Sequence, residues 1–186
     1  MTMEDYGRLT VREALQQHYR NSNLPHDGGY SRKQWTLITL GPVNVQLPNF
    51  AWRKRALHCH DIHHLVTGYP CTKAGELQIA AWEFAAGRFP NVCSTLFCLP
   101  LVGIGALVIP RKSFSAFVIG RRSKTLYAMG PTADVLGLRV RELRKKILPP
   151  TEFSANWRDY IGYFLLAVLS LAPLIGLVLG LFVLLR

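Results

Sequence analysis

The sequence predicts a mainly α-helical domain with a small N-terminal β-hairpin and a C-terminal transmembrane helix. Two neighbouring stretches between residues 50 and 87 have the length and the terminating glycines of helices, and two β-prone runs precede them. The last long stretch, 161–185, contains no charged side chain, and about 20 such residues can cross a bilayer. We therefore divide the chain into a helical metal-binding domain (1–150), a linker (151–160) and a transmembrane anchor (161–185).

The N-terminal part contains a helix and a hairpin. Thr10 precedes Glu13 by three residues, which is a capping-box signature, and the apolar residues that follow predict an amphipathic helix ending near Arg20. Between Trp35 and Leu47, the runs WTLITL and VNVQL lie on either side of Gly41-Pro42. This arrangement predicts a hairpin, because β-branched runs separated by turn formers favour paired strands.

Two helices should follow as an antiparallel pair. Residues 50–67 come after Pro48-Asn49, a stop followed by a helix-capping residue, and end at Gly68. A second helix opens at Cys71-Thr72 and continues until Gly87. The intervening turn is short, so the two helices should pack side by side.

The C-terminal half combines apolar segments with positive charge. The chain has 22 Lys and Arg against 11 Asp and Glu, a net charge of +11 that favours an anionic neighbour. Residues 91–110 are uncharged but are interrupted by Pro100, so we expect a buried or interfacial helix, with a re-entrant hairpin left open. Residues 135–148 predict an amphipathic helix, either lying on anionic lipid or packed on the core with a solvated basic face.

The distribution of charge also predicts a location. Basic residues both before and after 91–110 place the domain on the cytoplasmic side of a membrane, with 161–185 as the anchor. The start, MTMEDYGRLTVREAL, resembles neither a signal nor a transit peptide, and the four cysteines form no C-x-x-C pair, which fits a reducing compartment. Nucleic acid is not an expected partner, because the basic segment lacks interleaved aromatic residues and any recognisable motif.

Side chains that can bind a metal are concentrated in the stretch HCHDIHHLVTGYPCTKAGE, residues 58–76. At ~100° per residue, His64 lies ~40° round the helix from His60, and Asp61 lies ~100° from it, so the three share one face. An antiparallel second helix can bring Glu76 beside them. This set predicts a divalent metal site with His60, Asp61, His64 and Glu76 as ligands, although Asp61 could instead orient an imidazole N–H.

The remaining polar residues of this region have other predicted roles. His58 and His63 point away from His60 on the predicted helix, so we expect His63 to cap, pack or touch a ligand. Glu83 lies seven residues after Glu76 on the second helix; we favour a surface charge, and a second carboxylate near the metal is the alternative.

Three known metal patterns fit less well. Zinc proteases with H-E-x-x-H carry a glutamate where this chain has the shorter Asp61. Di-iron bundles need a second E-x-x-H-like element, and Asp61-x-x-His64 is the single match. HD phosphohydrolases share the adjacent His-Asp pair but need a distant histidine and aspartate, for which His26 and Asp134 are available, and we keep this class as a minor alternative.

The pattern His60-Asp61-x-x-His64, eleven residues and then Glu76 resembles the signature of the fourth coenzyme Q biosynthesis protein family, which acts in ubiquinone synthesis. The likeness covers residues 50–90 and fades outside them. It implies a largely helical fold, a divalent metal, usually zinc, held by His60, Asp61, His64 and Glu76, and association with membranes and polyprenylated lipids. The absence of a transit peptide and the predicted anchor suggest a bacterial relative at the inner membrane.

By this resemblance, the expected function is metal-dependent replacement of the carboxyl group at ring carbon one of a polyprenylated aromatic precursor by a hydroxyl group. No residue is assigned a catalytic role beyond the metal ligands. The alternative function is a non-catalytic scaffold that binds prenyl lipids and organises other quinone-biosynthesis enzymes. The resemblance implies a polyprenylated aromatic lipid and membrane phospholipid as partners, and it leaves homo-oligomer formation open.

Overall fold

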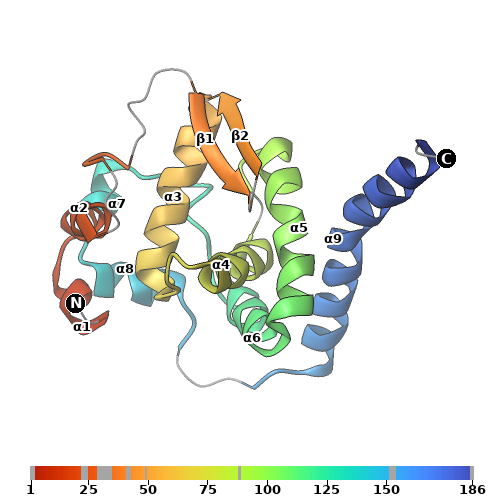
Figure 1. Cartoon of the computed structure of the whole chain (residues 1–186). Coiled ribbons are helices and arrows are strands. Elements are labelled where there is room, and N and C mark those ends of the chain that lie inside the picture. Colours follow the sequence, from red (N-terminus) through yellow and green to blue (C-terminus); the bar gives the residue numbers. More distant parts are fainter. Residues whose placement is uncertain are drawn as a thin grey trace.

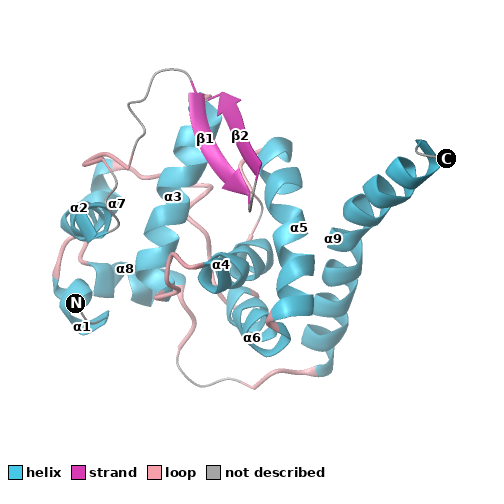
Figure 2. Cartoon of the chain, in the orientation of Figure 1, coloured by secondary structure: helices cyan, strands magenta, loops and turns pink. Residues whose placement is uncertain are grey.

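A computed structural model describes residues 3–21, 25–28, 35–40, 43–48, 50–87, 89–150 and 154–184. Within these ranges the chain forms nine helices and one two-stranded antiparallel sheet. Figures 1 and 2 show α3 (Ala51–Thr67) and α4 (Lys73–Ala86) between two groups of helices. The short helices α1 (Met3–Arg8), α2 (Val11–Asn21), α7 (Ala133–Gly137) and α8 (Val140–Ile147) lie on one side, and α5 (Val92–Val108), α6 (Pro110–Gly120) and α9 (Trp157–Leu184) lie on the other.

The N-terminal part contains the predicted helix and a short additional helix before it that we did not predict. After the short helix α1 (Met3–Arg8), α2 (Val11–Asn21) begins at a capping box in which Thr10 Oγ1 accepts from the Glu13 N–H at 3.3 Å and Glu13 Oε2 accepts from the Thr10 N–H at 2.9 Å. The apolar face of α2, including Leu15 and Tyr19, is buried in the core. The predicted helix is confirmed and extends one residue beyond Arg20.

Two strands occupy the predicted hairpin region. β1 (Trp35–Leu40) pairs antiparallel with β2 (Val43–Pro48), and the register joins Leu40 to Val43 at the turn end. The Gly41-Pro42 turn and the predicted helix cap Asn49 lie outside the described residues.

Both central helices form as predicted, but the expected packing as a side-by-side antiparallel pair is wrong, because in Figure 1 α3 is seen lengthwise and α4 nearly end-on. α3 (Ala51–Thr67) ends at Gly68, whose φ of 79° is left-handed and whose N–H donates to the His64 carbonyl at 2.9 Å. α4 (Lys73–Ala86) begins at Thr72, whose hydroxyl accepts from the Gly75 N–H. A Cβ at Gly75 would collide with the Pro70 carbonyl, so glycine allows the turn to approach α4 closely.

The uncharged segment 91–110 forms α5 (Val92–Val108), which is followed at once by α6 (Pro110–Gly120). The Asn91 side chain caps α5 by accepting from the Ser94 N–H at 2.8 Å, and the helix continues through Pro100. One side of α5 is buried at Val102, whereas Leu96 is 60% exposed. The helix therefore has a packed face and an exposed apolar face.

The continuous amphipathic helix that we predicted over 135–148 is wrong. α7 (Ala133–Gly137) and α8 (Val140–Ile147) are separate, because the backbone between them pairs with the start of α2: the Val11 N–H donates to Leu138 O, and the Val140 N–H donates to Leu9 O. In α8, Val140, Leu143 and Ile147 are buried. The apolar face is therefore packed on the core, as in the second of our two interpretations, and is not available to lipid.

The predicted C-terminal transmembrane helix is also wrong. Among the described residues, no helix is both long enough and apolar enough to span a membrane. The apolar run lies in α9 (Trp157–Leu184), which begins inside the predicted linker and packs along α5, where Ser170 and Leu171 meet Gly103. Part of its apolar surface is therefore used for helix packing, as the burial of Ala167 and Ser170 shows.

Candidate metal centre

Three side chains from α3 and α4 converge at the centre of the helical pair. His60 and His64 lie one turn apart on α3, and their Nε2 atoms are 3.1 Å apart. Glu76, in the first turn of α4, places one carboxylate oxygen 3.2 Å from His60 Nε2 and the other 3.3 Å from His64 Nε2. The potential ligand atoms all lie within 4.8 Å of one another, so this group could hold a metal ion.

The opposite nitrogen of each imidazole has its own partner. His64 Nδ1 lies 2.8 Å from the Tyr69 carbonyl oxygen, which can only accept, so Nδ1 carries the proton. His60 Nδ1 lies 3.1 and 3.2 Å from the two carboxylate oxygens of Glu83. Both rings therefore direct the Nε2 lone pair towards the shared point, which is the arrangement that outer hydrogen bonds impose on metal-bound histidines.

Glu83 belongs to this site, as in the less favoured of our two interpretations. The favoured interpretation, a surface charge, is wrong, because its side chain is 1% exposed and accepts hydrogen bonds from the Tyr127 hydroxyl at 2.7 Å and from His63 Nδ1 at 2.7 Å. His63 Nε2 in turn accepts from the Leu126 N–H. The available signal was the seven-residue spacing from Glu76, because two helical turns bring both carboxylates to the same side of α4.

The structure does not bring Asp61 into the group. Its carboxylate accepts a hydrogen bond from the Tyr19 hydroxyl of α2 at 3.1 Å. Asp61 therefore connects α3 to α2, whereas His60, His64 and Glu76 face one another. His26 and Asp134, which the phosphohydrolase alternative requires, are both exposed and also lie outside the group.

The electrostatics favour a positive charge at the shared point. Burial disfavours the imidazolium of His60, but the Glu83 and Glu76 carboxylates outweigh burial and raise its pKa well above the ordinary value. Burial likewise opposes charge on His64, but Cys71 and Glu76 raise its pKa to about 9. Burial would raise the pKa of Glu76, yet hydrogen bonds from the two histidines lower it to about 2. A divalent cation would supply the charge that protons otherwise provide.

An apolar cavity of about 340 Å³ adjoins the exposed side of this group. His60, Glu76 and Arg53 form the polar part of its wall. The rest is mainly apolar or aromatic, including Phe50, Leu57, Phe89, Phe97, Leu101 and Tyr127. The cavity therefore combines apolar walls with a few polar groups near a potential metal, which is the usual composition of a small-molecule site.

Comparison of the chain with models of protein families, with curated proteins and with solved structures finds no match. The fold and the site together define a mainly helical protein with a two-histidine, one-glutamate group that could bind a metal ion. The assignment of Asp61 as a further ligand stays a prediction, as does the identity of the metal.

Proposed function

We propose that this protein binds a divalent cation, zinc in the first instance, and acts on a polyprenylated aromatic precursor in ubiquinone biosynthesis. The observation that carries the proposal is the convergence of two oriented Nε2 atoms and one carboxylate beside an apolar cavity. Three protein ligands leave a coordination position for substrate, as in catalytic zinc sites. The resemblance of His60-Asp61-x-x-His64 and Glu76 to the coenzyme Q family pattern supplies the substrate class.

Residues of the cavity wall would contact the carboxylate, the ring and the start of the prenyl chain of such a substrate. Arg53 offers a planar cation for the carboxylate of an aromatic acid, and Phe89 and Phe97 offer faces for the ring and the start of the prenyl chain. The volume of about 340 Å³ suits a ring and a short part of the chain rather than a long polyprenyl tail. The rest of the tail would leave the cavity between Phe50 and Phe97, which are 51% and 50% exposed.

The bound cation would act as a Lewis acid towards the carboxylate and the neighbouring ring oxygen. Glu83 would hold His60 in the tautomer that keeps Nε2 free, and the apolar wall would exclude water around the ring. Loss of carbon dioxide leaves the bonding electron pair on ring carbon one. Replacing the carboxyl group by a hydroxyl group is a two-electron oxidation, for which molecular oxygen would be the electron acceptor: in net terms, the aromatic acid, water and oxygen would give the phenol, carbon dioxide and hydrogen peroxide.

The test starts with metal analysis of the purified protein and of the His64→Ala and Glu76→Ala variants. We expect one divalent ion per chain in the wild type, and affinity reduced by about 100-fold or more in each variant, because each removes a ligand. The proteins are then incubated under air with a prenylated hydroxybenzoate, and product is measured by mass spectrometry. Absence of metal from the wild type would contradict the proposed site.

The turnover assay separates the enzyme from the scaffold. Arg53→Gln should raise KM more than it lowers kcat, whereas Arg141→Gln, an exposed arginine on α8, should change neither. If the protein binds both metal and lipid but forms no product, the scaffold function stands instead. In that case, removing the metal should lower both the melting temperature and lipid binding.

A further inference from the structure

The exposed apolar side chains of this protein are concentrated on two adjacent helices. Of the described residues, the large apolar side chains that are at least half exposed lie on α5 and α9, with Phe50 and Met129 as exceptions. On α9 they recur at helical spacing and so form a stripe along one side, whose members are Tyr160, Ile161, Phe164, Leu165, Val168, Leu169 and Ile175. The neighbouring face of α5 adds Val92, Leu96 and Phe97 near one end and Leu107 and Val108 near the other.

The exposed charges that border this surface are mainly positive. No Asp or Glu occurs from Asn91 to Gly130, a range that includes all of α5 and α6, although it contains five Lys and Arg. Arg111 and Lys112 are exposed directly after the exposed end of α5. The acid of α9, Asp159, is buried and paired with Arg121 and Arg122, 3.2 and 2.8 Å away. Exposed cations therefore border the apolar surface, the acid of α9 is paired with arginines, and Glu76, which shares the cavity wall with Phe97, is paired with His60 and His64.

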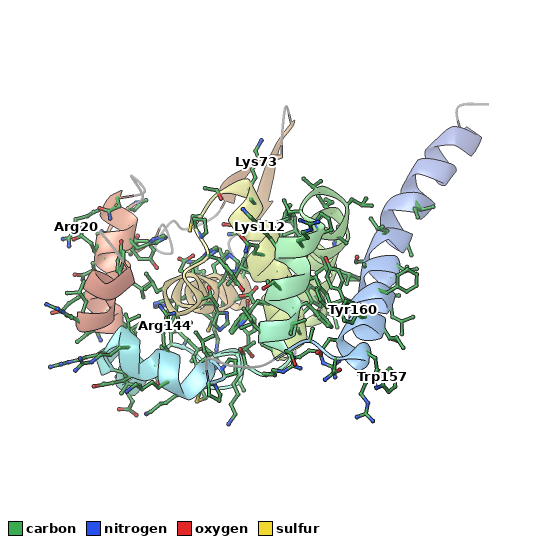
Figure 3. The ribbon with its side chains drawn as sticks, turned by 90° about the horizontal axis from the view of Figure 1, so that it is seen from below. Arg20, Lys73, Lys112, Arg144, Trp157 and Tyr160 are labelled. Carbon is green, nitrogen blue, oxygen red and sulfur yellow. The ribbon has the colours of Figure 1, made fainter. Side chains whose placement is uncertain are left out.

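The start of α9 carries amphipathic aromatic residues beside a cation. Trp157 is 66% exposed, and the Arg158 guanidinium lies 5.4 Å from the centre of its ring. Tyr160 is 59% exposed and stacks on Phe114 of α6. Figure 3 shows Trp157 and Tyr160 on the first turns of α9, at the opposite end of the molecule from Arg144 of α8. Exposed tryptophan, tyrosine and arginine are typical of residues at a lipid–water boundary.

We propose that the exposed faces of α5 and α9, which we call the α5–α9 face, dock on the surface of a bilayer containing anionic phospholipids. The apolar stripe would enter the boundary between headgroups and acyl chains, while Arg111, Lys112 and Arg158 contact the headgroup phosphates. A second copy of this chain fits less well, because two α5–α9 faces would bring like charges together. The face is distinct from α8, whose apolar side is buried in the core.

The docked orientation has a consequence for the cavity beside the metal centre. Cys93, Phe97 and Leu101 of α5 line that cavity, and Phe97 also belongs to the α5–α9 face, being 50% exposed. A bilayer lying on this face would therefore adjoin the cavity rim, so a lipid substrate could enter from the membrane. This consequence rests on the proposed function, whereas the docking surface stands on the exposed side chains and charges alone.

The experiment is sedimentation of the full-length protein with vesicles. One set consists of phosphatidylcholine, and the other is an equimolar mixture of phosphatidylcholine and phosphatidylglycerol. The wild type should bind the mixed vesicles, and added salt should weaken the binding. The double variant Leu165→Glu/Leu169→Glu places two charges within the apolar stripe and should lower the apparent affinity by about tenfold or more. Met129→Glu alters an exposed apolar residue in the loop near Arg55 of α3 and should bind like the wild type.

Charge variants give a second, independent readout. Arg111→Gln/Lys112→Gln should weaken binding to mixed vesicles by roughly fivefold for each cation removed and should reduce the salt dependence. The matched pair Lys145→Gln/Lys146→Gln removes two exposed cations from α8 and should leave the affinity within about twofold. Melting temperatures and metal content serve as folding controls. Both should match the wild type, because the four substituted residues of the two double variants are exposed.

Two outcomes would overturn the proposal. The first is equal binding of mixed vesicles by the wild type and the Leu165→Glu/Leu169→Glu variant. The second is absence of vesicle binding together with a wild-type dimer, detected by light scattering, that the same variant dissociates, because the occupant would then be a second copy. Turnover and metal content are measured separately, so failure of docking is distinguishable from failure of the proposed function.

Discussion

The Glu83 carboxylate lies 3.1 Å from Nδ1 of His60, the ring nitrogen opposite the one that faces Glu76. A single imidazole is therefore held between two carboxylates of the same helix, two turns apart. Glu76 faces the candidate metal position, and Glu83 fixes the tautomer and the ring orientation. The division of roles follows from burial: the Glu83 side chain is 1% exposed and the Glu76 side chain 40%.

Replacing Glu83 by glutamine should weaken metal binding without removing a ligand. Glutamine keeps the size of the side chain, but it removes the negative charge that supports His60, His63 and Tyr127. We expect about a 10- to 100-fold loss of zinc affinity, measured by competition with a chromophoric chelator. Unchanged affinity would show that Glu83 has only a structural role.

Replacing Asp61 by asparagine should leave the metal in place. Its carboxylate accepts from the Tyr19 hydroxyl, and an asparagine side-chain oxygen can accept the same bond. We expect metal affinity within about threefold of the wild type and a loss of stability on the order of 1 kcal/mol, measured by urea unfolding. A loss of affinity as large as that of Glu76→Ala would identify Asp61 as a ligand.

The turn between α3 and α4 should be intolerant of a side chain at Gly75. A Cβ there would overlap the Pro70 carbonyl and push Glu76 away from the histidines. We expect Gly75→Ala to lower stability by about 1–3 kcal/mol and to weaken metal binding. Gly137→Ala is the matched control, because nothing lies within 4 Å of the new Cβ, and it should be neutral or slightly stabilising.

The start of α9 should lose stability in acid. Asp159 accepts from Arg122 Nη2 at 2.8 Å and from the Asn156 N–H at 2.9 Å, and the Arg122 hydrogen bond lowers its pKa below the ordinary value of 3.8. Because the folded pKa is lower than the unfolded one, the stabilisation is fully present above the unfolded pKa and is lost as the pH falls through the folded pKa.

The variant Asp159→Asn isolates this effect. At neutral pH it should melt below the wild type, with a loss of about 1–2 kcal/mol. The difference should start to shrink as the pH falls below 3.8, where the unfolded chain takes up a proton at this position, and should be lost as the pH falls through the lower pKa of the folded state. Melting curves recorded by circular dichroism at several pH values provide the measurement, and a difference independent of pH would refute the role of the charge.

The sequence alone determined the local features of this protein, namely its helices, their caps and the side chains that share a helix face. The i, i+4 spacing of His60 and His64 fixes their common face on any helix, and the glycine that ends α3 sets a short turn that brings Glu76 to them. The mainly helical character follows for the same reason, because helix periodicity and caps are properties of neighbouring residues.

Only the tertiary structure decided which face of each helix is buried. Glu83 became an internal partner of His60 because α3 and the loop carrying Tyr127 cover that side of α4. Asp61 accepts a hydrogen bond from Tyr19 because α2 packs against α3. The apolar face of α8 is buried in the core, whereas much of the apolar face of α9 is exposed. Which helix face is buried depends on contacts between segments that are far apart in sequence. Hydrophobic periodicity alone does not distinguish a helix packed on the protein core from a helix that faces a lipid surface.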